Sequence, residues 1–183
     1  MMYAGLAYKC SMALGDKTPP RSIILSDEFD ALGPKGGILD FQKDVYLKPT
    51  GTGNGGDQNF PLLFTEFSQY VNTIATSYAV YDVAPDDVIA GDASRDFAWF
   101  VERYLRILRS KYKTEYDKIA NDQCWRQLIL ADWGRVNRYW VESTKENLTK
   151  LVTDESPKVD VLIKDPMLFA EIENLRVLDG CRR

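Results

Sequence analysis

The chain has 183 residues, a formal net charge of -4 and a pI near 5.0, which fits one domain with a sizeable core. It contains no histidine, and this excludes Ser-His-Asp and Cys-His nucleophiles, histidine general bases and the commonest zinc sites. The acidic balance argues against indiscriminate binding to nucleic acid or anionic membrane, and no apolar run approaches the ~20 residues of a membrane span.

Residues 1–59 hold most of the glycines and prolines and predict an irregular N-terminal arm. The short apolar pieces at 23–25 and 38–47 alternate too briefly to specify a sheet alone. We therefore expect short strands or turns that lie over a helical domain at 60–183, or over a neighbouring subunit. The acidic run at 26–30 fits helix capping better than a cation site, because it lacks the spacing of a calcium loop.

The loop at 51–56 matches G-x-G-x-x-G, the glycine pattern of dinucleotide-binding folds, and follows a strand-like piece at 45–47. In those folds a helix begins inside the motif, so that its N-terminus meets the pyrophosphate. Here Asp57 to Pro61 intervene and put an acidic residue near the phosphate position. We expect a flexible or partner-contacting loop and no cofactor, with nucleotide binding as an alternative.

Helical spacing returns at 61–80, with Pro61 suited to the first turn. The apolar residues that follow this spacing are Leu63, Phe64, Phe67, Tyr70, Val71, Ile74 and Tyr78. A strand at 79–83 is an alternative because β-branched residues are frequent from Val71 to Val83. A short helical turn is expected at 85–87, before a break at Gly91 and Asp92.

A longer helix is predicted over 93–118, capped by Asp92 and burying Phe100, Tyr104 and Leu108. Its other face gathers aromatic and basic side chains, which we call the arginine stripe: Arg95, Trp99, Arg103, Arg106, Arg109 and Lys113. Trp99 is one turn from Arg95 and from Arg103, within cation–π reach. Because Trp and Arg dominate interface hot spots, we expect the stripe to contact a protein partner. A solvated, internally paired face and a nucleic-acid contact are the alternatives.

The helix predicted over 122–151 buries Ile129, Val136 and Trp140. Asp132 falls inside its apolar stripe, where an unpaired carboxylate costs several kcal/mol. We expect a structural ion pair, with Arg135 or with an arginine of the helix over 93–118, or a partly exposed carboxylate, rather than a catalytic acid. Further along, 159–163 is strand-like or extended, and a final helix is expected over 166–179, begun by Asp165 and Pro166 and ended by Gly180.

Three cysteines at long spacing, Cys10, Cys124 and Cys181, indicate neither a disulfide framework nor a metal site. A buried thiol is expected at Cys124, with a cofactor attached at Cys10 or Cys124 as an alternative. Residues 1–14 lack the leading positive charge of a signal peptide. We expect an intracellular reducing compartment or a virion, and an organelle reached after removal of a transit sequence is a further alternative.

These observations predict a mainly α protein: a bundle of about four main helices with an irregular arm and at most a few short strands. The function they favour is a non-enzymatic structural or assembly subunit of a viral or phage particle or of a cellular complex, joined to other proteins or to copies of itself. A nucleic-acid-binding coat protein is the first alternative. An enzyme using carboxylates or a nucleotide is the second.

Overall fold

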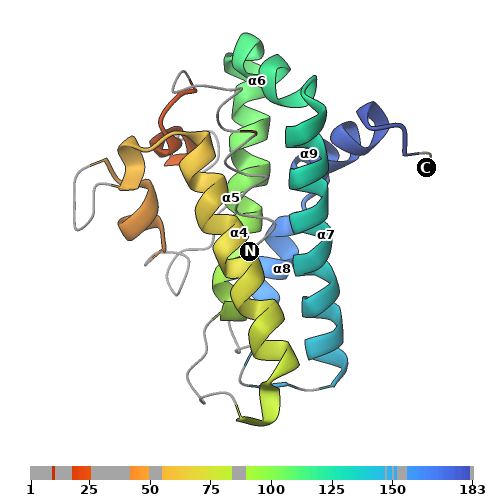
Figure 1. The fold of residues 1–183 in the computed structure, drawn as a ribbon. Helices are drawn as coiled ribbons and strands as arrows, with labels where there is room; N and C mark the ends of the chain where they lie inside the picture. Colours follow the sequence, from red (N-terminus) through yellow and green to blue (C-terminus); the bar gives the residue numbers. More distant parts are fainter. Residues whose placement is uncertain are drawn as a thin grey trace.

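Three long helices form the body of the molecule in the computed structural model: α4 (Phe60–Ala79), α5 (Ala90–Lys111) and α7 (Gln123–Lys145) (Figure 1). The structure describes residues 10, 18–25, 42–49, 55–83, 90–146, 148–149, 151 and 156–181. These residues contain helices and no β-strand, which confirms the predicted mainly α bundle. None of the helices among them is long and apolar enough to cross a membrane.

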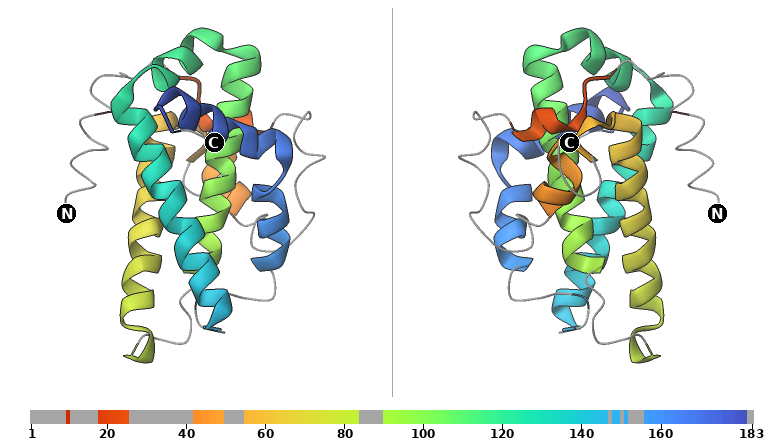
Figure 2. Two further views of the ribbon diagram at one scale, coloured as in Figure 1. Left: turned by 90° about the vertical axis from the view of Figure 1, so that its right-hand side faces the viewer. Right: turned by 90° about the vertical axis from the view of Figure 1, so that its left-hand side faces the viewer.

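The central helix is α5, which lies between α4 and α8 (Ser156–Ile163) in both views of Figure 2. Two further helices, α6 (Lys113–Ala120) and α9 (Pro166–Leu178), also pack against α5. As a result, every residue from Gly91 to Leu105 is buried, on the polar side of the helix as well as on the apolar side. The sequence pattern predicted burial of the apolar side only.

Helix ends follow the capping signals in the sequence. The side chain of Asn59 accepts a hydrogen bond from the Leu62 amide, and Asp122 accepts one from the Trp125 amide. Asp165 accepts from the first amides of α9, and Gly180 follows α9 with a φ of 81°, the left-handed conformation that glycine adopts most readily. The predicted starts near Pro61, Asp122 and Asp165 are confirmed.

The helix predicted over 93–118 is in fact two. It begins earlier, at Ala90, so that Asp92 lies in its first turn instead of capping it. Tyr112 interrupts it with φ -133° and ψ 56°, outside the helical region, and α6 begins at the next residue. The interruption turns the chain toward α7, which α6 also contacts.

The segment at 159–163 is helical, so the prediction of a strand-like or extended segment there is wrong. In α8, Val159 and Ile163 are buried while Val161 is 70% exposed, an i, i+4 pattern that a strand could not give. The β-branched end of α4 stays helical to Ala79, and a 3-10 turn, η4 (Tyr81–Val83), follows. Low helix propensity costs only ~0.5 kcal/mol per residue, less than the packing of this face gains.

The described parts of the N-terminal arm are short helical turns: η1 (Arg21–Leu25), η2 (Lys43–Leu47) and η3 (Gly55–Asp57). The first of these turns lies over the helical body, as expected, because η1 packs on α5 and the Tyr104 hydroxyl donates to the Pro19 carbonyl at 2.6 Å. The amide of Phe60 donates to the Thr18 hydroxyl at 3.1 Å. The predicted features at 26–30, 51–54 and 85–87 lie outside the described residues.

A disulfide joins Cys10 to Cys124 across 114 residues of chain, and Cys181 is free and exposed. The expectation of unpaired cysteines is therefore wrong for this pair. Because the bond occupies both sulfurs, it also removes the two attachment points considered for a cofactor. The cysteine argument for a reducing compartment no longer holds.

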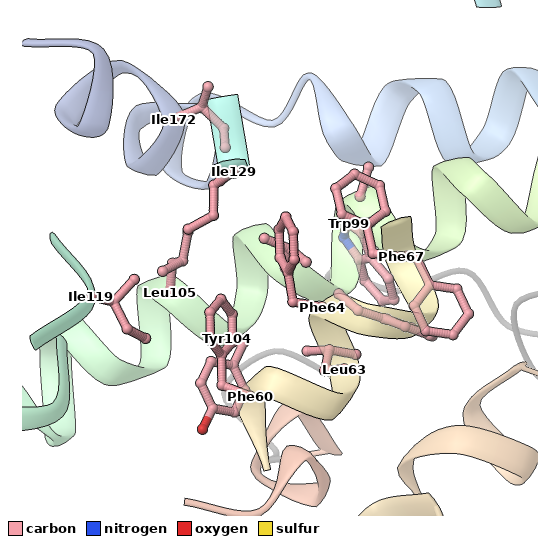
Figure 3. Packing of buried hydrophobic residues seen from close by; sticks show 14 of the residues in the cluster. Phe60, Leu63, Phe64, Phe67, Trp99, Tyr104, Leu105, Ile119, Ile129 and Ile172 are labelled. Carbon is pink, nitrogen blue, oxygen red and sulfur yellow. The ribbon is translucent and has the colours of Figure 1, made fainter. Parts of the chain in front are cut away.

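The core is rich in aromatic rings contributed by α4, α5 and α7. Phe60 packs on Tyr104 with 5.1 Å between ring centroids (Figure 3). It also packs on Trp125 at 5.2 Å, and both distances are typical of favourable ring pairs. The residues predicted for the centre of the bundle are all buried: Phe100, Tyr104, Leu108, Ile129, Val136 and Trp140.

Gly91 marks a close approach of two chain segments. A Cβ added there would lie 1.7 Å from the carbonyl oxygen of Leu151, which is far inside van der Waals contact. The glycine is therefore required by packing and not by a break in the helix, since α5 runs through it.

Candidate functional site

The arginine stripe is mostly inside the protein. The side chains of Arg95, Trp99 and Arg103 are at most 1% exposed, so the exposed face predicted for them is corrected. The cause is α8 and α9, which cover this side of α5. In the folded chain these three residues are out of reach of a protein or nucleic-acid partner.

The cation–π contacts expected on the stripe are present in part. The Arg103 guanidinium lies 4.4 Å from the centroid of Trp99, as the spacing predicted. Arg95 stacks instead on Trp140 of α7, at 4.1 Å, and pairs with Asp160 of α8. Arg95 therefore joins three helices.

Further along the stripe, Arg106 and Arg109 are about one third exposed and both meet one carboxylate of α9. Their guanidinium nitrogens lie 3.6 and 3.0 Å from Oε1 of Glu171, whose side chain has no exposed surface. Burial raises the pKa of Glu171, and the two arginines oppose that rise. We call this arrangement the Glu171 clamp. Lys113, the last residue of the stripe, is exposed and pairs with Asp117 one turn on.

Two more carboxyl groups are buried along α5. Burial raises the pKa of Asp96 and of Glu102 well above the ordinary range. Glu102 accepts a 2.7 Å hydrogen bond from the indole of Trp133, whereas neither oxygen of Asp96 accepts one from the described residues. Burial thus favours the protonated form of both groups, because a carboxylate away from water is costly.

Asp132 has the structural role expected of it. Its buried carboxylate accepts hydrogen bonds from the Ser68 hydroxyl at 2.6 Å and from Arg135 at 3.3 Å. Burial raises its pKa, and both partners oppose the rise. The carboxylate thus ties α4 to α7, and both of its oxygens accept hydrogen bonds.

The end of the glycine loop is also explained by packing. The Gly56 amide donates to the Lys48 carbonyl at 3.1 Å, and a Cβ there would lie 2.2 Å from the Leu47 carbonyl oxygen. Gly55 accepts a hydrogen bond from Arg21, which is buried. These two glycines allow η3 to approach η2 closely, and the Gly56 amide is used inside the protein rather than presented to a phosphate.

A cavity of about 440 Å³ opens between α5, α7, α8 and α9, which we call the α5–α9 cavity. Its described lining consists of Arg95, Trp133, Asn137, Ile163, Lys164, Phe169 and Arg176. Sequence reasoning missed most of it, because its α8 wall was predicted as a strand. Glu171 could have been found from the sequence in the same way as Asp132. It is an acidic residue inside an apolar stripe, between Leu168 and Leu175.

Within the described residues, no group of three or more Asp, Glu or Cys side chains is placed to hold a metal ion. Comparison of the chain with protein-family models, with curated proteins and with solved structures found no match.

Proposed function

We propose that the protein is a non-enzymatic assembly subunit, of a viral or phage particle or of a cellular complex, that joins other copies of itself through its last two helices. The observation that carries the proposal is the exposure of aliphatic side chains there. Of the nine large hydrophobic side chains exposed in the described part of the chain, four belong to α8 and α9: Val161, Met167, Val177 and Leu178.

The end of α9 is suited to contact another molecule. Figure 1 shows this end at the edge of the bundle, near the C-terminus, and Val177 and Leu178 there are 54% and 49% exposed. Burying apolar surface gains roughly 25 cal/mol per Å², so adjacent exposed aliphatic side chains favour association. The contact surface that we propose therefore lies on α9 and not on the arginine stripe.

The test is the native mass of the purified chain, measured by light scattering at micromolar concentrations. We expect a multiple of the 20.9 kDa monomer. The double variant Val177→Asp/Leu178→Asp should shift the mass toward the monomer, because two charges would have to be buried in the contact.

The matched control is Val80→Asp/Val83→Asp, which changes two exposed valines at the far end of α4 and should leave the mass unchanged. A monomeric unmodified chain would contradict self-assembly. An equal fall in native mass in both double variants would contradict the placement of the self-association surface on α9.

A further inference from the structure

We propose that the α5–α9 cavity binds a small organic anion that carries a flat apolar group. Its volume, about 440 Å³, lies within the ~300–1,000 Å³ of small-molecule pockets. Such pockets combine apolar walls with a few polar groups that fix the orientation of the ligand. The lining residues supply both kinds of surface.

The apolar wall is formed by two rings and an aliphatic side chain. Trp133 and Phe169 lie 5.5 Å apart between centroids and are inclined at 55°, and Ile163 completes the wall. The Trp133 indole is held in place because its Nε1 donates to buried Glu102 at 2.7 Å. A fixed aromatic surface of this kind favours a flat ligand, since little side-chain freedom is lost on binding.

The polar wall is cationic. Arg95, Lys164 and Arg176 line the cavity, and no carboxylate is among the described lining residues. Asp160 is shared between Arg95 and Lys164, while Arg176 pairs with Glu173 at 3.0 Å. Three cationic side chains and no carboxylate among the described lining residues therefore favour an anionic ligand.

Arg95 provides the least solvated of these charges. Its side chain is 1% exposed, and its Nε has no hydrogen-bond partner among the described residues. Burial lowers its pKa only to about 10, so the guanidinium is charged at neutral pH. An unpartnered donor on a buried cation gains more from an anion than an exposed lysine would.

The probe for this cavity is 1-anilinonaphthalene-8-sulfonate, a flat aryl sulfonate whose fluorescence rises in apolar surroundings. Its neutral counterpart, N-phenyl-1-naphthylamine, lacks the sulfonate. We expect one sulfonate bound per chain, at least 10-fold more tightly than the neutral compound. The double variant Lys164→Met/Arg176→Met should weaken sulfonate binding about 10-fold and leave the neutral compound unaffected.

The matched control is Arg138→Met/Lys145→Met, which removes two exposed cations of α7 that do not line the cavity and should not change the affinity. The site is located by the indole NMR signals of the four tryptophans. The signal of Trp133, assigned from Trp133→Phe, should move on addition of the sulfonate, and that of Trp99 should not.

Three results would overturn the proposal: no binding by the unmodified chain, equal affinity for the two compounds, or an unmoved Trp133 signal with binding retained. If Lys164→Met/Arg176→Met fails to fold, Asn137→Phe replaces it. That substitution fills the cavity from α7 and should abolish binding, whereas binding at the aliphatic end of α9 would survive. The proposal is independent of self-assembly, because native mass does not enter the test.

Discussion

Removing the two arginines of the Glu171 clamp should destabilise the fold. The double variant Arg106→Met/Arg109→Met keeps the aliphatic length of both side chains and leaves the carboxyl group of Glu171 buried without a cation. Had the stripe been an exposed face, the same change would have cost at most ~1 kcal/mol per ion pair.

The expected magnitude follows from burial. Removing one side of a fully buried ion pair costs ~3–5 kcal/mol. The two guanidinium groups are 31% and 34% exposed, so water already weakens their attraction to Glu171, which is fully buried. We therefore expect a loss of ~2–3 kcal/mol in the free energy of unfolding at pH 7.

The loss should depend on pH with a definite sign. Because burial raises the pKa of Glu171, the native state binds its proton more tightly than the unfolded chain does, and stability falls as pH rises through the native pKa. Without the arginines the native pKa rises further. The stability that the double variant lacks relative to the unmodified chain should thus be largest above the native pKa of Glu171 in the variant. It should shrink toward pH 4.5, the ordinary pKa of glutamate.

Urea unfolding at pH 8, 7, 6 and 5 measures this deficit. Adding Glu171→Gln to the double variant removes the buried charge and should restore most of the lost stability at pH 7. The control Lys113→Met breaks an exposed pair on the same stripe and should leave stability almost unchanged. A double variant as stable as the unmodified chain, or no recovery on adding Glu171→Gln, would refute the clamp.

Two further predictions concern packing and the disulfide. Gly91→Ala should destabilise the fold by ~1–3 kcal/mol, because the added Cβ would meet the Leu151 carbonyl oxygen. Gly134→Ala, which has open space around it on α7, should stabilise the fold by up to ~1 kcal/mol. Thermal melts that rank the two variants in the opposite order would contradict this. Thiol titration of the unfolded, unreduced protein should find one free thiol, at Cys181, and three would refute the bond. The variant Cys10→Ser/Cys124→Ser should lose up to ~5 kcal/mol, because the bond closes a loop of more than 100 residues.

The parts of the fold that were predictable are those set by local physics. Caps at Asp122 and Asp165 and the glycine after α9 act within one turn, and the helical spacing of α4, α5 and α7 reports which side of each helix is apolar. Asp132 was predictable because an acid among apolar neighbours requires a partner nearby, and Arg135 is three residues away.

The parts that failed depend on distant segments. After the break at Tyr112 the chain contacts α7, and at Gly91 it passes close to Leu151. No local sequence pattern contains either contact. The pairing of Cys10 with Cys124 joins residues 114 apart, and sequence spacing does not determine such a pair. For α8, a short apolar run fits a strand and a buried helix equally well from its pattern alone.

The arginine stripe shows how a correct pattern can lead to a wrong surface. The stripe predicts a partner outside the chain, with an internally paired face as an alternative, and Asp160 of α8 and Glu171 of α9 supply the opposite charge from within. An amphipathic helix with a strongly basic face therefore identifies the need for an anionic neighbour but not whether that neighbour belongs to another molecule. Here the covering helices carry the acids inward, and their aliphatic side chains, such as Val161 and Leu178, remain outside. The partner surface that we propose is therefore apolar, although the stripe that predicted a partner is basic.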